Sequence, residues 1–140
     1  MTDKPEKKIT IVGDVMSHGV MTIPATATVH DAVKIMRDKR TSSVVVERRD
    51  EADEFGMITV VNVAADVLAK NLSPERVNVY EVMSKPVLNL PTEMNVVYAV
   101  RMLTRFKLNR ALVVDHDRKP LGIVTLRDMV LRTLAEEEGE

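Results

Sequence analysis

Apolar and polar positions along the chain follow a helical period in two separate segments. In residues 29–39 and 96–106, apolar side chains recur every three or four positions, which is typical of a helix with one buried face. Thr28 and Asn95 directly precede these segments, and both are good N-cap residues. The sequence therefore predicts two amphipathic helices, one in each half of the chain.

Short runs of β-branched and aliphatic residues predict the strands around these helices. In each half, one run ends at a proline before the helix, and two further runs separated by a polar turn follow it. A second helical pattern then closes the half, so the order is strand, helix, strand, strand, helix. The predicted strands are residues 20–23, 43–47 and 55–59, then 87–90, 111–115 and 121–125, and the closing helices are residues 60–70 and 126–138.

The two halves are copies of one another. A shift of 67 positions places DVMS at 14–17 on EVMS at 81–84. After a loop of unequal length the shift becomes 66, and GMITVVN at 56–62 falls on GIVTLRD at 122–128. A unit of about 60 residues is too small to bury a sufficient core alone, so each copy needs its twin. We expect an α/β (α+β) fold of two β-α-β-β-α subdomains packed face to face with pseudo-twofold symmetry.

The repeat also sets the expected domain boundaries. Polar residues occupy both ends of the chain and the segment NLSPERVN between the copies. Such segments are typical of solvated tails and linkers. We expect an N-terminal tail at 1–8, a first subdomain at 9–70, a linker at 71–78, a second subdomain at 79–135 and an acidic tail at 136–140.

Composition narrows the classes of function. Hydrophobic residues make up 45% of the chain but aromatic residues only 3%, so the core is aliphatic. The net charge of -1 argues against a domain built to bind the nucleic-acid backbone. The chain has no cysteine, which excludes disulfides and thiolate metal sites and fits a reducing compartment. No segment approaches 18 uninterrupted apolar residues, so we expect a cytoplasmic protein with no membrane partner.

The segment GIVTLRD at 122–128 contains the strongest candidates for ligand-binding residues. Thr125 stands where a strand gives way to a helix, and Asp128 follows one helical turn later. One interpretation is a capping box, worth ~1 kcal/mol, that needs no ligand. The other is a ligand site, because a helix N-terminus attracts phosphate and a carboxylate can accept from both hydroxyls of a ribose. The two interpretations are compatible.

The duplicated order, the word VMS before each first strand, and the pattern Gly-apolar-x-Thr-x-x-Asp together resemble a pair of cystathionine β-synthase (CBS) domains over residues ~9 to 135. The resemblance implies that Thr125 contacts phosphate or ribose and that Asp128 holds the ribose hydroxyls of an adenosine nucleotide. It implies a phosphate contact from Arg110 and an apolar slot for the adenine. The residues implied for this site are Thr125, Asp128, Arg110, Asn109, Val87, Leu88 and Ile123.

The first copy departs from the pattern. Asn62 stands in place of the aspartate, and an amide makes weaker hydrogen bonds to a diol than a carboxylate does. Ser42 and Ser43 stand where the second copy has Asn109 and Arg110, so a phosphate partner is missing. We expect a weaker second site made of Thr59, Asn62, Val20, Met21 and Met57.

Other chemistry has little support in the sequence. His18, His30 and His116 are scattered, so neither a metal site nor a histidine-based nucleophilic centre is indicated. The segment DHD at 115–117 lies in a predicted polar turn, whose composition explains these acids without an ion. We expect no catalytic residues, no metal and no catalytic cofactor.

Two functional hypotheses follow from the residues and the resemblance. The first is a non-catalytic sensor that binds AMP, ADP, ATP or S-adenosylmethionine between the repeats and transmits binding to a regulated enzyme or transporter. The family implies a disc-like homodimer. The alternative is a protein-interaction scaffold in which one or both nucleotide sites are degenerate, and Asn62 is the residue that favours it.

Overall fold

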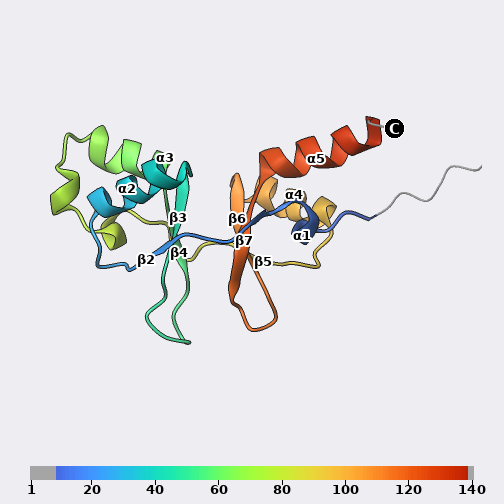
Figure 1. The fold of residues 1–140 in the computed structure, drawn as a ribbon, viewed down its shortest axis with the longest axis horizontal. Helices are drawn as coiled ribbons and strands as arrows, with labels where there is room; N and C mark the ends of the chain where they lie inside the picture. The colour runs from blue at the N-terminus through green and yellow to red at the C-terminus, as the bar shows by residue number, and fades with distance from the viewer. Residues whose placement is uncertain (1–8, 139–140) are drawn as a thin grey trace, which may run out of the picture. The chain divides into compact units, whose positions relative to one another are not determined.

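The computed structural model describes the backbone of residues 9–138 and the side chains through residue 135. The chain forms two compact units (Figure 1). One unit is Val20–Val87, and the other joins the segment ending at Gly19 to the chain from Leu88 onward. Each unit is a sheet with helices, as the predicted order of elements required.

The Val20–Val87 unit contains a three-stranded sheet in the order β2-β3-β4. β2 runs parallel to β3, and β3 pairs antiparallel with β4. The helices lie on one face of this sheet (Figure 1). The elements are β2 (Thr22–Ile23), α2 (Val29–Lys39), β3 (Ser43–Val46), β4 (Gly56–Thr59), α3 (Val60–Val63), a π-helix (Ala64–Leu68) and two 3-10 turns (Pro74–Arg76 and Val79–Glu81).

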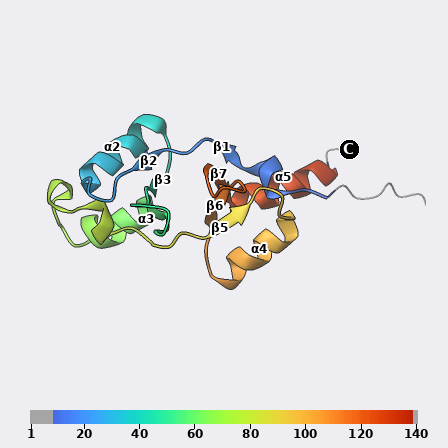
Figure 2. The same ribbon diagram turned by 90° about the horizontal axis from the view of Figure 1, so that it is seen from below.

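The second unit contains a four-stranded sheet in the order β1-β7-β6-β5. β5 is parallel to β6, and the pairs β6-β7 and β7-β1 are antiparallel. Helices α4 and α5 lie on the same side of this sheet (Figure 2). The elements are α1 (Val12–Val15), β1 (Ser17–His18), β5 (Asn89–Pro91), α4 (Val96–Arg105), β6 (Arg110–Val114), β7 (Pro120–Thr125) and α5 (Leu126–Glu138).

Each sheet is completed by the segment that precedes the first strand of the other repeat. Ser17 and His18 follow the first VMS word, yet they pair with Ile123 and Gly122 of the second repeat. Ser84 follows the second VMS word and exchanges two backbone hydrogen bonds of 2.9 Å with Met57 of the first repeat. The compact units therefore divide after Gly19 and Val87, whereas the boundaries expected from the sequence follow the repeat.

The predicted helices and their caps are present. α2 spans residues 29–39 as predicted, and Thr28 and Asp31 form a capping box with bonds of 3.1 and 3.2 Å. Asn95 Oδ1 accepts the N–H of Val97 at 2.8 Å at the start of α4. α5 runs through Glu138, so part of the expected acidic tail is helical. The expected N-terminal tail at 1–8 and the last two residues lie outside the described part of the chain.

Two predictions of local structure need correction. The segment 60–70 was predicted as one helix, but the structure has one α-helical turn followed by a π-helix. In the wider turn the N–H of Ala69 donates to the carbonyl of Ala64 at 2.8 Å, and Val67 is buried in the core. The first strand of each repeat is also shifted: β2 and β5 begin two residues later than predicted, because ladder pairing starts only there.

The helical faces of the two units bury separate aliphatic cores. α2 contributes Val29 and Met36, and α4 contributes Val96 and Leu103, at the helical spacing seen in the sequence. Val33 has the same spacing but is 39% exposed, so the predicted apolar stripe of α2 is only partly covered. The aliphatic composition is thus sufficient for two cores, one on the helical side of each sheet.

Candidate functional site

Thr125 lies at the junction between β7 and α5, where the sequence placed it. The backbone N–H of Asp128 donates to Thr125 Oγ1 at 3.0 Å, which is the N-cap bond predicted for this word. The Asp128 carboxylate accepts no hydrogen bond from any described residue, and its Oδ1 lies 4.0 Å from Nη1 of the exposed Arg127. Only one half of the capping box is formed, so the carboxylate keeps its acceptor capacity.

Arg110 lies directly opposite Thr125 in the β6-β7 ladder. Paired residues of an antiparallel ladder project on the same face of the sheet. Asn109 contacts both strands at this point. Its carbonyl accepts the N–H of Leu126, the residue after Thr125, at 2.8 Å, and its Oδ1 accepts from Arg110 Nε at 3.3 Å. Partial burial lowers the pKa of Arg110 from its ordinary value, yet a guanidinium stays charged at neutral pH. The structure thus brings together Asn109, Arg110, Thr125 and Asp128.

The strand residues beside this group alternate between the two faces of the sheet. Ala111, Val113 and Val124 belong to the core under the helices. Arg110, Ile123 and Thr125 are their neighbours in sequence and therefore project on the helix-free face. A cation, an apolar side chain and a hydroxyl thus share one face of the sheet.

Ile123 pairs with a segment that the resemblance did not name. Ser17 pairs with Ile123, and a Cβ on Gly122 would overlap the carbonyl oxygen of Ser17. Gly122 thus permits the close approach of a backbone segment, which comes from the first VMS word. Val87 lies in the other compact unit, where its N–H donates to the carbonyl of Phe55 at 3.0 Å.

Leu88 belongs to the same unit as Thr125 but lies across the sheet. Its carbonyl accepts the N–H of Leu112 at 2.9 Å, and Leu112 in turn pairs with Ile123. One strand, β6, therefore separates Leu88 from Ile123. Sequence reasoning missed Ser17 and His18 as neighbours of the site, although the VMS word before each first strand marked the segments that are exchanged.

The first repeat has the same junction with different hydrogen bonds. Asn62 Oδ1 accepts from the backbone N–H of Thr59 at 2.9 Å and from its hydroxyl at 3.0 Å, while the N–H of Asn62 donates to Thr59 Oγ1 at 3.2 Å. The capping box is complete. The amide oxygen that corresponds to the Asp128 carboxylate is therefore occupied within the chain.

The remaining residues expected at this weaker site lie in the same compact unit. Ser43 pairs with Thr59 where the second repeat has Arg110, so no cation stands at that position. Met57 is buried, whereas Met21 is 37% exposed and its carbonyl accepts the N–H of Val45 at 2.9 Å. Val20 is half-buried and precedes β2. This site lacks both the carboxylate and the guanidinium of the second repeat.

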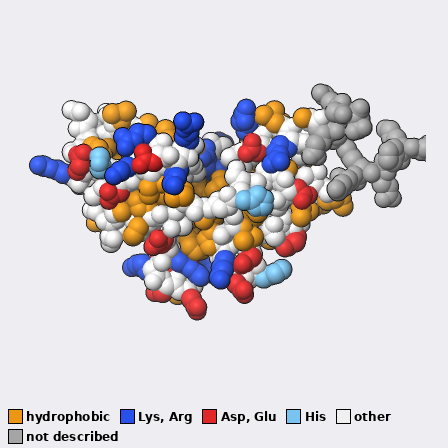
Figure 3. Space-filling model, in the orientation of Figure 1, with side chains coloured by type: hydrophobic (Ala, Val, Ile, Leu, Met, Phe, Trp, Pro, Cys, Tyr) orange, Lys and Arg blue, Asp and Glu red, His pale blue; other side chains and the backbone are white. Residues whose placement is uncertain are grey.

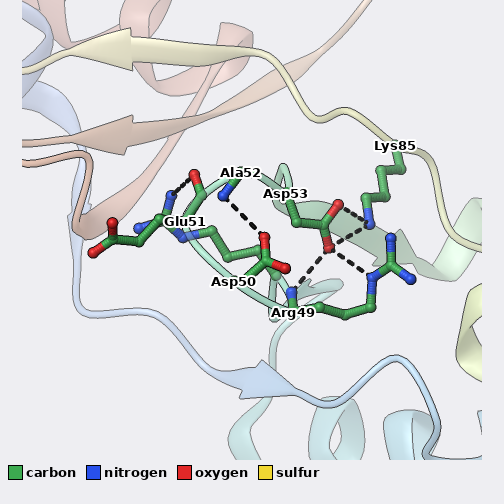
Figure 4. A network of polar contacts seen from close by, with 7 residues as sticks. Arg49, Asp50, Glu51, Ala52, Asp53 and Lys85 are labelled. Atoms are coloured by element: carbon green, nitrogen blue, oxygen red, sulfur yellow. Dashed lines mark hydrogen bonds and ion pairs between the residues drawn. The ribbon is translucent and has the colours of Figure 1, made fainter.

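Charged side chains gather on the two hairpin loops (Figure 3). In the β3-β4 loop, Lys85 Nζ contacts Asp53 Oδ1 at 2.8 Å and Oδ2 at 2.9 Å, and the N–H of Arg49 donates to Oδ2 at 2.9 Å (Figure 4). These donors hold the pKa of Asp53 well below its ordinary range. The ion pair between Lys85 and Asp53 connects the β3-β4 loop to the segment that follows Ser84.

Other candidate groups have structural explanations. Asp115 Oδ1 accepts the N–H groups of Asp117 and Lys119 at 2.8 and 2.9 Å, which confirms the polar turn predicted for DHD. Within the described residues, no three His, Asp or Glu side chains are grouped closely enough to hold a metal ion. None of the described helices is both long enough and apolar enough to cross a membrane.

Comparison with known proteins identifies both repeats. A family model described as CBS domain matches residues 12–68 and 79–134. An uncharacterised protein of Methanopyrus kandleri is 32% identical over 120 residues, which cover 85% of this chain and 60% of that protein. The chain spans 43% and 61% of two further curated relatives, so it matches only part of their length.

Solved structures share the fold. A hexameric CBS-CP12 protein from bloom-forming cyanobacteria is 31% identical with a TM-score of 0.87, and the match covers 94% of this chain and 72% of that one. The CBS domain pair of protein MJ0100, solved in complex with 5'-methylthioadenosine and S-adenosyl-L-methionine, is 24% identical with a TM-score of 0.77. That match covers 93% of this chain and 99% of the other, and at this identity it shows the fold alone.

Proposed function

Because the chain belongs to the CBS-domain family, with one CBS domain in each repeat, we propose that it is a non-catalytic regulatory module that binds an adenosine-containing ligand at Thr125 and Asp128. CBS pairs are regulatory modules. That this chain binds an adenosine-containing ligand is our proposal. The domain boundaries at 9–70 and 79–135 are retained as part of it. We propose a cytoplasmic location, with which the lack of cysteine agrees.

One observation carries the ligand proposal: among the described residues the Asp128 carboxylate accepts no hydrogen bond, and its only close charged neighbour is the exposed Arg127 at 4.0 Å. Thr125 caps α5, but the return bond of a capping box is not among the hydrogen bonds of the described residues. A half-buried carboxylate beside a helix start can accept hydrogen bonds from two adjacent hydroxyls, and charge assistance roughly doubles the strength of each. A ribose 2',3'-diol offers this pair of donors.

Arg110 and Thr125 support a ligand with a phosphate or a polar tail. They project from paired positions on the helix-free face, so a group that reaches one of them can reach both. AMP, ADP and ATP supply a phosphate, and S-adenosylmethionine supplies an adenosine with a charged sulfonium and an amino-acid tail. Half-buried Ile123 offers apolar surface for an adenine.

The two repeats should bind unequally. In the first repeat Asn62 Oδ1 already accepts two hydrogen bonds from Thr59, so a ribose would have to displace them. Ser43 occupies the position of Arg110 and brings no charge. We therefore assign one strong site per chain, at Asp128, and a weak or unfilled site at Asn62.

Calorimetric titration with AMP, ADP, ATP and S-adenosylmethionine tests the proposal. We expect one of them to bind with a stoichiometry near one per chain, and Asp128→Ala to weaken binding by about ten- to a hundredfold, equivalent to ~1.5–3 kcal/mol. Asp66→Ala, which removes an exposed carboxylate that pairs with Lys70, is the matched control and should bind as wild type. Unchanged affinity in Asp128→Ala refutes the residue assignment.

The competing function is a protein-interaction scaffold without a ligand. Its support is the complete Thr59–Asn62 capping box, which occupies the first site. A thermal-shift panel separates the two functions, because a specific ligand at 100 times its dissociation constant adds ~2.7 kcal/mol of stability. No shift with any adenosine compound favours the scaffold.

Self-association and a regulated partner complete the proposal. The 31% identical structure is described as hexameric, and that assembly supports an oligomer for this chain. We propose a homodimer that passes the bound state to a regulated enzyme or transporter. A ligand can shift such an equilibrium only by its difference in affinity for the two states.

A further inference from the structure

The exposed surface of α4 carries aromatic and basic side chains side by side. Tyr98 and Phe106 are 56% and 57% exposed, and the exposed Arg101 and Arg105 lie between them in sequence. Tyr98, Arg101 and Arg105 follow one another at spacings of three and four residues, so they share one face of the helix. The guanidinium of Arg101 lies over the Tyr98 ring, with Cζ 5.4 Å from the ring centroid. Lys107 is exposed in the turn after the helix, and we call these five residues the α4 stripe.

The charge of the stripe has one sign. The net charge of the chain is -1, but residues 94–114 contain four basic side chains, Arg101, Arg105, Lys107 and Arg110, and no Asp or Glu. Among the described residues, no ion pair involves Arg101, Arg105 or Lys107. The positive charge of the stripe is therefore not offset by a described carboxylate, and it favours the approach of an anion.

The first repeat shows that the fold does not require this stripe. With the shift of 67 positions, Tyr98 corresponds to Asp31 and Arg105 to Asp38. Asp31 closes the capping box at the start of α2, and Asp38 Oδ1 pairs with Arg37 Nε at 3.3 Å. The corresponding surface of α2 thus mixes both signs of charge, whereas that of α4 combines positive charge with aromatic rings.

The helix dipole accounts for only part of the stripe. Basic residues are favourable at a helix C-terminus, and both repeats have one in the left-handed conformation just after the helix, Arg40 after α2 and Lys107 after α4. Phe106, however, stands where α2 has the charged Lys39, and Tyr98 lies near the start of α4. The dipole gives no reason for these two exposed rings, which are half of the four aromatic residues in the chain.

Single-stranded nucleic acid combines the two properties that match the stripe. Its phosphates pair with arginine and lysine, and its bases stack on aromatic rings and on guanidinium planes. Tyr98 and Phe106 are eight positions apart, which is ~12 Å along a helix. At ~3.4 Å per stacked nucleotide, this length accommodates about three to four nucleotides. A duplex keeps its bases stacked on one another, and an acidic peptide offers carboxylates without flat bases, so neither partner uses the rings.

We propose that the α4 stripe binds single-stranded nucleic acid, in which Arg101, Arg105 and Lys107 contact phosphates while Tyr98 and Phe106 stack with bases. The stripe contains none of the residues of the candidate ligand site, so this inference does not depend on the proposed function. It assigns the binding to the second repeat alone, because α2 contains no aromatic residue.

Fluorescence anisotropy on the full chain tests the inference, with a fluorescein-labelled oligothymidylate of about 12 nucleotides as the probe. We expect the single strand to bind more tightly than a duplex of the same length, with an affinity that falls as salt concentration rises. Tyr98→Ala should weaken binding about tenfold through lost stacking, whereas Tyr98→Phe keeps the ring and should bind as wild type. The double variant Arg101→Gln, Arg105→Gln should lower the slope of log affinity against log salt concentration by about 1.4, the value for two phosphate contacts of a single strand.

The matched control is the double variant Lys34→Gln, Lys39→Gln, which removes two exposed charges from the corresponding helix of the first repeat and should leave binding and its salt slope unchanged. Every substituted side chain is exposed, and urea unfolding checks that each variant is folded. A wild-type chain that does not bind the single strand at about 100 µM in low salt overturns the inference. So does wild-type affinity in Tyr98→Ala, or an equal loss in the control and the stripe variants. Poly-L-glutamate that displaces the probe as well as unlabelled oligothymidylate of equal charge identifies an acidic protein as the partner and also overturns it.

Discussion

Asp128→Asn makes the second repeat resemble the first at its candidate site. The substitution keeps the size and shape of the side chain and removes its charge. In the first repeat, Asn62 at the corresponding position completes a capping box with bonds of 2.9 and 3.2 Å. We therefore expect the introduced amide to turn towards Thr125 and to adopt the hydrogen bonds of Asn62.

The expected loss of binding free energy follows from the two hydrogen bonds that the ribose hydroxyls would donate to the carboxylate. A hydrogen bond to a charged group contributes about 1.5–3 kcal/mol and a neutral one about 0.5–1.5 kcal/mol, so each ribose hydroxyl loses ~1 kcal/mol. Two hydroxyls lose ~2 kcal/mol, which is roughly thirtyfold in affinity. The free energy of unfolding without ligand should not fall, because the new side chain completes the cap.

Two measurements on one variant test this reasoning. Calorimetry gives the dissociation constant of the adenosine ligand, and urea unfolding without ligand gives stability. The reciprocal change Asn62→Asp is the matched control, and it should strengthen any binding at the first site. Unchanged affinity in Asp128→Asn refutes the role of the carboxylate. Loss of stability together with affinity indicates a structural role instead.

Three further predictions concern stability, and urea unfolding measures each. The pKa of Asp53 is lowered by Lys85, so its contribution to stability is complete above the ordinary carboxyl pKa and is lost as pH falls through the lowered value. The difference in free energy of unfolding between wild type and Asp53→Asn should therefore be constant near neutral pH and become smaller in acid. A difference that becomes larger in acid contradicts this. Gly122→Ala should cost about 1–3 kcal/mol because its Cβ overlaps the Ser17 carbonyl, and a neutral effect would show that the β1 pairing is dispensable. Leu103→Ala should cost about 2–5 kcal/mol because Leu103 is fully buried, whereas a cost below about 1 kcal/mol would mean that the core collapses around the cavity.

Much of the candidate site could be predicted because its hydrogen bonds are local. Thr125 and Asp128 are three residues apart, and the N-cap bond between them depends only on where the helix starts. The positions of Asn109 and Arg110 near Thr125 could be predicted from the repeat, which aligns the start of β6 with the start of β3. The unequal chemistry of the two copies was likewise visible in Asn62 and Ser43.

The neighbours across the sheet could not be predicted in the same way. The resemblance implied Val87, Leu88 and Ile123 around one slot, but it did not indicate that Ser17 pairs with Ile123. The two VMS words are alike, and either one could satisfy the backbone of β7 equally well. Loop closure favours the word nearer in sequence, so tertiary packing decides which of the two pairs with β7.

The sequence by itself determined the duplication, the order of elements in each copy, the caps of α2 and α4, and the family. These features depend on periodicity and on contacts between residues a few positions apart, which the order of residues specifies directly. The tertiary structure alone decided that each sheet takes its last segment from the other repeat and that Val33 is exposed in a groove. It also decided that Asn62 Oδ1 accepts hydrogen bonds from Thr59, whereas the Asp128 carboxylate accepts none from the described residues. Packing decides these, because side chains distant in sequence compete for the same space and the same hydrogen bonds.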